Sequence, residues 1–419
     1  MKRFAFALLY VSLAACEHRR AAPAAANSSP HVAALSASAP ASESSARPAP
    51  TVLSVDQHMT KIFAPAHQLQ PYRGPRVKRI VDRCAVLEDE SVRCFDGFEQ
   101  LAARVEKVHL GSAGLFSEAD EWKSGCAADT QGLVSCWGNV RAHTLGDKSR
   151  CHVVPLPPNP EGEDRKCPEI DGLYYCGIRA RVCDEPTRLA RLGPVTQLAG
   201  AEHNCALNAK GELWCWGDNA RNEGPGRDRC RIPRGTNGQL GSEYCFDPVR
   251  VLGLPPLASF SLSAARTCAV TREGKLFCWG AFESVQYDAP TEQKDWPRLT
   301  EAVLTDGFLC GRTEAGEVHC QREGQQKPEV VPGLGRVTKL TGDALTCALN
   351  ERGEVWCWMR SYPPFDKPHQ VPAITSATQI SARAGFACAI LKDGAAYCWG
   401  SWTYRGAFES TPPLPLFDP

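Results

Sequence analysis

The sequence predicts an all-β protein, a seven-bladed β-propeller of four-stranded blades, on three observations. Fourteen of the 21 cysteines form seven pairs with a spacing of ten residues. The unit around each pair recurs about every 40 residues where no insertion expands it, and strand-like segments such as 195–199 and 337–341 precede the pairs. Forty residues accommodate four short strands, and radial repetition of four-stranded sheets is the propeller architecture. The 35 glycines, 32 prolines and only 3 methionines also favour a turn-rich β protein.

Residues 1–15 have the organisation of an export signal. Lys2 and Arg3 precede an apolar run over residues 4–13, which is too short to span a bilayer as a helix. The run ends in the letters L-A-A-C at Cys16, which resemble the lipobox of bacterial lipoproteins. That resemblance implies cleavage before Cys16 and lipidation of its thiol. The alternative is an ordinary signal peptide followed by a chance cysteine.

Residues 16–75 are predicted to form a lipidated, disordered tether that precedes the propeller at 76–419. Of the 34 residues in 17–50, 12 are Ala, 7 are Ser and 5 are Pro, so the segment cannot bury enough apolar surface to offset its ordering entropy. We expect an exported protein that is lipid-anchored to the cell envelope. The outer membrane is favoured because Glu17, and not Asp, follows the lipidated cysteine.

The repeats are predicted to carry one disulfide each, because an export signal implies an oxidising compartment. The ten-residue pairs are Cys84–Cys94, Cys126–Cys136, Cys205–Cys215, Cys268–Cys278, Cys310–Cys320, Cys347–Cys357 and Cys388–Cys398. Six repeats have Gly six residues after the first cysteine, whereas the first repeat has Glu90. Five repeats have Trp after the second cysteine, with Phe95 and Gln321 in the first and fifth. We interpret these tryptophans as core residues.

The segment 205–215 illustrates how the repeat predicts a hairpin. Two short apolar runs flank Asn208-Ala-Lys-Gly211, which suits a type I turn followed by a glycine in the left-handed region. Pairing Asn208 with Glu212 then places Cys205 directly opposite Cys215, within disulfide range. Both faces of the hairpin carry apolar residues, so each hairpin is expected to pack between two neighbours.

Residues 195–217 resemble the repeat of the regulator of chromosome condensation family, with Cys205-Ala-Leu and Cys215-Trp-Gly in the expected order. Asn237-Gly-Gln-Leu-Gly241 matches that family's signature once. The resemblance covers about 76–419, in the cysteine-rich form found in exported bacterial proteins, and implies a seven-bladed propeller. It implies no single function, because family members include a nucleotide-exchange factor and a β-lactamase inhibitor.

Two insertions, at about 139–194 and 217–247, interrupt the repeat and contain all six remaining cysteines of this region. We predict a Cys230–Cys245 disulfide in the second insertion. Cys151, Cys167, Cys176 and Cys183 in the first insertion allow three connectivities, and the sequence does not select among them. Long cross-linked loops on a rigid scaffold are common recognition sites; the alternative is tolerated surface decoration.

Candidate binding residues lie in the first insertion: Tyr174, Tyr175, Arg179 and Arg181. Tyr and Arg are enriched at binding hot spots. The 47 basic and 47 acidic residues balance, which argues against a nucleic-acid partner. No zinc-type cysteine spacing and no hydrolase or phosphate-binding motif occurs. We therefore expect no catalytic residues, metal or cofactor, and interpret His203 as structural.

The predicted function is that of a lipid-anchored bacterial envelope protein, a monomeric, non-catalytic propeller scaffold. It would bind a protein or glycan partner through its loop face. Two alternatives remain open at this point: an envelope hydrolase with a site at the propeller axis, and a purely structural surface lipoprotein.

Overall fold

The computed structural model describes residues 69–95, 108, 110–116, 125–139, 151–155, 169–170, 173–174, 179–201, 203–230, 243–282, 285–305, 308–322, 324–343, 345–359, 367–383, 386–404 and 407–417, together with Ala102 and Ser149. Cys16 and the predicted tether up to residue 68 lie outside these residues. The chain divides into the units Met1–Pro50 and Thr51–Pro419, and every described strand belongs to the second.

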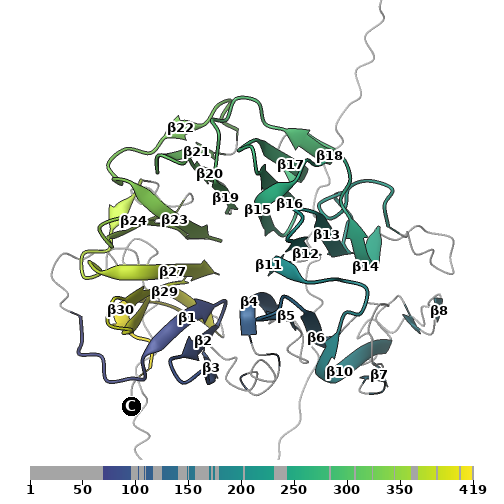
Figure 1. Ribbon diagram of the computed structural model, residues 1–419, viewed down its shortest axis with the longest axis horizontal. Helices are drawn as coiled ribbons and strands as arrows, with labels where there is room; N and C mark the ends of the chain where they lie inside the picture. Colours follow the sequence, from purple (N-terminus) through teal and green to yellow (C-terminus); the bar gives the residue numbers. More distant parts are fainter. Residues whose placement is uncertain are drawn as a thin grey trace, which may run out of the picture. The chain divides into compact units, whose positions relative to one another are not determined.

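In the described part of the chain, strands form seven antiparallel sheets arranged radially around one centre, which confirms the predicted seven-bladed β-propeller (Figure 1). Blade 1 contains β1 (Val77–Val81), β2 (Cys84–Leu87) and β3 (Val92–Cys94). Blade 2 contains β4 (Leu110–Phe116), β5 (Gly125–Asp129), β6 (Val134–Asn139), β10 (Arg179–Arg188) and β7 (Cys151–Pro155) in that spatial order. A separate two-stranded sheet pairs β8 (Glu169–Ile170) with β9 (Leu173–Tyr174).

The other five blades each have four strands in sequence order. Blade 3 contains β11 (Val195–Gly200), β12 (His203–Asn208), β13 (Leu213–Asp218) and β14 (Tyr244–Arg250). Blade 4 contains β15 (Leu257–Ser263), β16 (Arg266–Thr271), β17 (Leu276–Phe282) and β18 (Val285–Glu292). Blade 5 contains β19 (Glu301–Leu304), β20 (Phe308–Arg312), β21 (Val318–Arg322) and β22 (Glu329–Val330). Blade 6 contains β23 (Val337–Gly342), β24 (Thr346–Asn350), β25 (Val355–Trp358) and β26 (His369–Gln370). Blade 7 contains β27 (Ala377–Arg383), β28 (Phe386–Leu391), β29 (Ala396–Tyr404) and β30 (Ala407–Pro415).

The hairpin between the second and third strands follows the predicted chemistry. In blade 3 the amide of Gly211 donates to the carbonyl of Asn208 at 3.0 Å, and the Asn208 side chain accepts from the amides of Lys210 and Glu212. Gly211 has φ +84°, and a Cβ there would lie 2.6 Å from the backbone nitrogen of Leu257. Glycine is thus needed both for the turn and for the approach of blade 4.

The turn sets the register that the disulfides require. Cys205 lies opposite Cys215 and Leu207 lies opposite Leu213, and all seven hairpins have a disulfide whose Cα atoms are 3.9–4.2 Å apart. Each bridge closes a short loop and contributes about 2–3 kcal/mol. In blade 1, Glu90 takes the glycine's place with φ 65° and pairs with Lys78.

An aromatic side chain from one blade packs against the preceding blade at six interfaces. Trp137, Trp216, Trp279, Trp358 and Trp399 are all buried, as the sequence predicts, and Phe95 of blade 1 packs against blade 7. Each of these residues directly follows the second cysteine of its hairpin. The interface between blades 4 and 5 is different, because Gln321 stands at the corresponding position.

The innermost strands are joined around the centre by bonds from side chains to the neighbouring blade's backbone. Gln197 of blade 3 bonds to Phe260 of blade 4 in this way. Gln379 of blade 7 makes the same pair of bonds to Ile80 of blade 1. Blades 1 and 7 also share a buried apolar cluster. The ring therefore closes by packing between blades, and every strand of blade 7 comes from the C-terminal part of the chain.

Glu301 makes the corresponding connection between blades 5 and 6. Its carboxylate accepts from the amide of Leu340 at 2.9 Å and from Arg312 and Lys339. Burial alone would raise the pKa of the Glu301 carboxyl, but Lys339 and the hydrogen bonds outweigh burial and hold it below its ordinary value. The group therefore remains ionised and serves as a structural acceptor.

Candidate binding face

Both insertions leave the propeller on the same side. In each blade the first and third strands end on this side, because the strands alternate in direction. The first insertion connects the third and fourth strands of blade 2, and the second connects those of blade 3. We call this side the insertion face; it includes the strand ends at Gly200, Asp218, Phe282 and Arg322.

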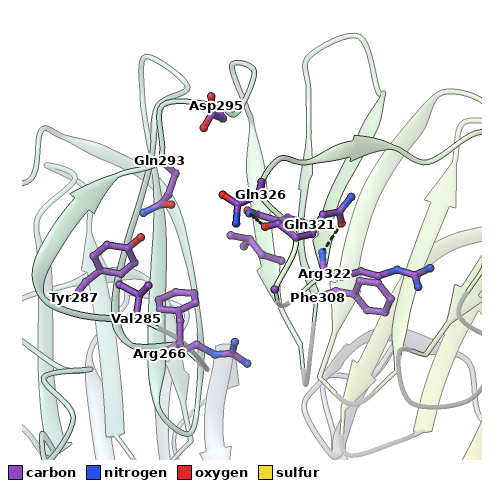
Figure 2. Close-up of a pocket in the computed structure, with 13 residues that line it drawn as sticks. Arg266, Val285, Tyr287, Gln293, Asp295, Phe308, Gln321, Arg322 and Gln326 are labelled. Atoms are coloured by element: carbon purple, nitrogen blue, oxygen red, sulfur yellow. Dashed lines mark hydrogen bonds between the residues drawn. The ribbon is translucent and has the colours of Figure 1, made fainter. Parts of the chain in front are cut away.

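A cavity of about 300 Å³ opens between blades 4 and 5 (Figure 2). Val285, Tyr287 and Gln293 line one side of it, and Gln321 and Gln326 line the other. Gln321 stands where five other blades place a buried tryptophan. The smaller, polar side chain leaves this interface less filled, and the volume lies at the lower end of the range for ligand pockets.

The aromatic rings and the guanidinium group of the cavity wall come from blade 4. Arg266 lies over the ring of Phe282 at 5.3 Å. Arg322 lies over the ring of Phe308 at 5.6 Å, but these two side chains point from blade 5 away from the cavity (Figure 2). Phe282 also packs edge-on against Tyr287, with the ring centroids 5.6 Å apart. Such pairs hold the rings in defined orientations and add to the energy of burial.

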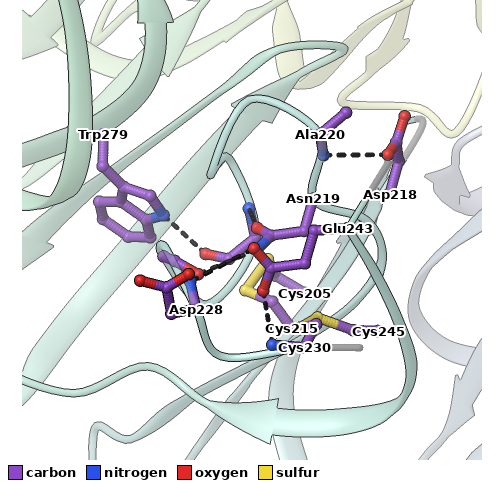
Figure 3. The surroundings of a disulfide bond; sticks show 12 residues. Cys205, Cys215, Asp218, Asn219, Ala220, Asp228, Cys230, Glu243, Cys245 and Trp279 are labelled. Atoms are coloured by element: carbon purple, nitrogen blue, oxygen red, sulfur yellow. Dashed lines mark hydrogen bonds between the residues drawn. A yellow bond between two sulfur atoms is a disulfide. The ribbon is translucent and has the colours of Figure 1, made fainter. Parts of the chain in front are cut away.

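The second insertion is anchored to blade 4 through its backbone (Figure 3). The indole Nε1 of Trp279 donates to the carbonyl of Gly224 at 2.6 Å, and the Thr267 hydroxyl donates to the carbonyl of Glu223 at 2.6 Å. Asn219 braces the loop internally by bonding to both Gly224 and Gly226. Residues 222–226 are consequently buried, whereas Arg221 and residues 227–229 on either side are exposed.

A disulfide and a carboxylate hold the far end of this loop. The structure joins Cys230 to Cys245, with Cα atoms 4.8 Å apart. The carboxylate of Glu243 accepts from the amides of Asp228 and Cys230 (Figure 3). Arg227 pairs with Asp288 of blade 4 at 2.7 Å. The described part of the loop is therefore a fixed element of the insertion face.

His203 lies beneath this loop and is fully buried. Its Nε2 is 2.7 Å from the Thr267 hydroxyl, whose proton is used in the bond to Glu223. The hydroxyl oxygen must therefore accept from Nε2, so Nε2 carries a proton. Burial lowers the pKa of His203 to about 3. This geometry supports the structural role that the sequence suggests for His203.

The first insertion extends blade 2 as regular β-structure. Strand β10 pairs with β6 through its second half and with β7 through its first half, so β7 becomes a fifth strand at the outer edge. Cys151 lies opposite Cys183 and forms a disulfide with it. Cys167 and Cys176 lie outside the described residues. The range 139–194 therefore contains the fourth strand of blade 2, β10, as well as the inserted strand β7.

The four predicted binding residues do not fall on one element. Tyr174 lies in β9, opposite Glu169 of β8. Arg179 and Arg181 lie in β10, opposite Pro155 and Val153 of β7. Tyr175 lies outside the described residues, so the grouping of these four side chains stays a prediction.

The cavity was not predicted from the sequence, although one residue of the repeat indicates where it lies. Gln321 is the one non-aromatic residue at its repeat position. A missing tryptophan alone does not show that space remains, because another side chain can fill it. Trp296, from the connection between blades 4 and 5, donates to Gln321 at 3.2 Å and packs against the same apolar cluster, yet the cavity persists.

No group of three or more side chains that could hold a metal ion occurs among the described residues. Glu223 has a raised pKa, mainly through burial, but its carboxylate accepts from the backbone amide of Arg221. The described residues also contain no helix long and apolar enough to cross a membrane.

Comparisons with known proteins agree with this architecture. Residues 199–223 match the model of the Regulator of chromosome condensation (RCC1) repeat. The chain is 29% identical over 182 residues to the RCC1 domain-containing protein RUG3, mitochondrial, of Arabidopsis thaliana, covering 37% of this chain and 40% of the relative. It is 25% identical over 267 residues to the E3 ubiquitin-protein ligase HERC2 of Homo sapiens, covering 55% of this chain and 5% of the relative. The chain thus spans less than half the length of these relatives.

Among solved structures, yeast RCC1 (Prp20) in complex with Kap60 is similar in fold. The TM-score is 0.50 at 14% identity, and the match covers 70% of this chain and 73% of the yeast chain. A structure of Prp20p from Saccharomyces cerevisiae matches with the same TM-score and identity and covers 75% of that chain.

Proposed function

Because the chain is an RCC1-type β-propeller, we propose that it is a non-catalytic scaffold that binds a protein partner through its insertion face. The observation that carries this proposal is the anchored second insertion. Its backbone is fixed by Trp279 and Thr267, while Arg221, Arg227 and Arg229 around the anchored segment are exposed. A loop that is rigid before binding loses little entropy on association, and arginine is enriched at binding hot spots.

The fold neighbour supports a protein partner. Yeast RCC1 is bound to Kap60 in its crystal structure. In this chain, the described residues of the insertion face supply arginine, aromatic and amide side chains around a pocket. The first insertion adds a second candidate contact region around Tyr174, Tyr175, Arg179 and Arg181.

We further propose that the protein works outside the reducing cytosol, anchored to a bacterial outer membrane through a lipid on Cys16. The disulfides of the seven hairpins favour an oxidising compartment. Two or more acyl chains on one cysteine would give stable anchoring, since each buried CH₂ contributes about 0.8 kcal/mol. Changing Cys16→Ser is expected to move the protein from the membrane to the soluble fraction, as measured by fractionation. Membrane retention of the exported variant would contradict the lipid anchor.

The binding proposal is tested by cross-linking capture from intact envelopes with two loop variants. R227A/R229A removes charges from the second insertion. In a second variant, an Asn-Gly turn replaces residues 156–178 and joins β7 to β10, whose ends Pro155 and Arg179 lie opposite each other. This deletion keeps the Cys151–Cys183 disulfide and removes Cys167 and Cys176 together. We expect at least one variant to lose the captured partner.

The matched control is R298A/R336A, which removes two exposed arginines beside the hairpin turns at Gly274 and Gly316 on the opposite side. It should retain capture. Equal capture by all variants would move the binding site away from both insertions. Capture of nothing by the unmodified protein would contradict the scaffold function.

A further inference from the structure

We propose that the cavity at Gln321 receives an aromatic side chain, such as tryptophan, from the protein partner. This inference rests on the proposed function and specifies its chemistry. The propeller itself shows which group fits this kind of site. At six interfaces an aromatic ring follows the second cysteine and packs against the preceding blade, whereas blade 5 offers an amide and an open cavity.

The walls suit a flat aromatic ring. Phe282 and Tyr287 supply ring faces and edges from blade 4, and Leu309 adds an apolar side chain from blade 5. The contact of the two rings with each other and the contact of Phe282 with Arg266 orient them. Aromatic pairs of offset or edge-to-face geometry add about 0.5–1.5 kcal/mol beyond area burial. The pocket is thus arranged before the ligand arrives.

The rim of the cavity suits the peptide backbone of a partner segment that presents an aromatic side chain. Gln293, Gln325 and Gln326 line the cavity with amide groups, which can both donate and accept hydrogen bonds to a peptide backbone. Gln321 is oriented by its own bond to the carbonyl of Gln325 at 2.7 Å. Arg266 and Asp295 contribute one positive and one negative charge to the lining, and the Arg322 side chain points away from it (Figure 2), so the site does not select a strongly acidic ligand.

The edge of the site adjoins the rest of the insertion face. Val285 is 47% exposed at the start of β18, and the same strand carries Asp288, which pairs with Arg227 of the second insertion. An extended partner segment could therefore contact the arginine-bearing loop and place one aromatic side chain between blades 4 and 5.

The first test uses N-acetyl-L-tryptophanamide as the probe and the variant Q321W. This substitution introduces the residue that five other repeats carry, so it should fill the cavity and preserve the fold. We expect the unmodified protein to bind the probe with a Kd of about 1 mM, a value typical of so small a ligand. Q321W should bind it at least about tenfold more weakly. The measurement is a saturation-transfer NMR titration.

The matched control is Q286W, which places a tryptophan on the β17–β18 hairpin of blade 4, across the cavity from Gln321, at an exposed position outside the cavity lining. It should bind the probe as the unmodified protein does. N-acetyl-L-leucinamide should bind at least about tenfold more weakly than the tryptophan probe. Equal probe binding by Q321W and the unmodified protein would overturn the proposal, as would equal binding of the two amides. Binding of N-acetylglucosamine that is lost in Q321W would assign the cavity to a glycan instead.

The same variants separate this inference from the proposed function. Loss of envelope capture in Q321W with retention in Q286W would support an aromatic anchor from the partner. Capture that survives Q321W would overturn the anchor and leave the scaffold function standing. If the unmodified protein captures no partner, the proposed scaffold function is contradicted. The same result contradicts an aromatic side chain supplied by a partner protein, even if the cavity binds N-acetyl-L-tryptophanamide.

Discussion

Changing Trp279→Ala is expected to lower the free energy of unfolding by about 3–5 kcal/mol. The side chain is fully buried between blades 3 and 4, so its removal leaves a cavity in a shared apolar cluster. It also removes the donor from the Gly224 carbonyl and so weakens the anchor of the second insertion. Urea denaturation followed by tryptophan fluorescence measures the global loss. Trypsin should in addition cleave the variant faster at the exposed Arg221, Arg227 and Arg229.

Trp214→Ala is the matched control. Trp214 lies in β13 of blade 3 and is only partly buried. It packs against blade 2, on the face of the β12–β13 hairpin opposite the one that Trp279 covers. Its loss should cost about 1–2 kcal/mol, less than full burial implies, and it should leave cleavage of the loop unchanged. Equal destabilisation by the two variants, with no change in proteolysis for Trp279→Ala, would show that the loop is anchored by other contacts.

Acid is expected to destabilise the protein through His203. In the unfolded chain this imidazole has its ordinary pKa near 6.5, whereas burial lowers its pKa to about 3 in the folded protein. The stability associated with the neutral side chain is fully present above pH 6.5 and is lost as the pH falls from 6.5 towards 3, because only the unfolded state binds the proton. Below pH 6.5, each further unit of acidification lowers the free energy of unfolding by about 1.4 kcal/mol. The total loss between pH 7 and pH 4.5 is therefore about 2.5 kcal/mol.

The variant H203Q isolates this contribution. The glutamine amide can donate to Thr267 as the imidazole Nε2 does, but it does not titrate in this range. At pH 7 the variant should be less stable than the unmodified protein by about 1 kcal/mol, through imperfect packing. The difference in stability between the two proteins should narrow below pH 6.5 and reverse at about pH 5.7. Parallel stability curves for the two proteins between pH 7 and 4.5 would contradict the assignment.

The local part of the fold was predictable because its causes lie within ten residues. The Asn208 side chain and the conformation of Gly211 determine the turn, and the turn determines that Cys205 meets Cys215. The same residues recur in other repeats, so the blade and its repetition could be inferred together. Exceptions to the pattern were also visible, as Glu90 and Gln321 show.

The insertions were not predictable in this way. Strand β7 joins the edge of blade 2 because β10 is long enough to pair with two strands, and this pairing selects Cys151–Cys183 from the possible connectivities. The second insertion is anchored by Trp279, a residue of the next blade 55 positions from Gly224. Such contacts depend on where neighbouring blades place their side chains, and no local pattern encodes them.

The sequence by itself determined the repeat, its hairpins and its propeller architecture, because each of these follows from short-range turn chemistry repeated along the chain. Tertiary structure alone decided how the ring closes, through Gln379 and packing between blades 1 and 7. It also decided that the space beside Gln321 stays open while Trp296 lies next to it. Whether a missing side chain becomes a pocket depends on the packing of every neighbour around it, and that is a property of the assembled blades.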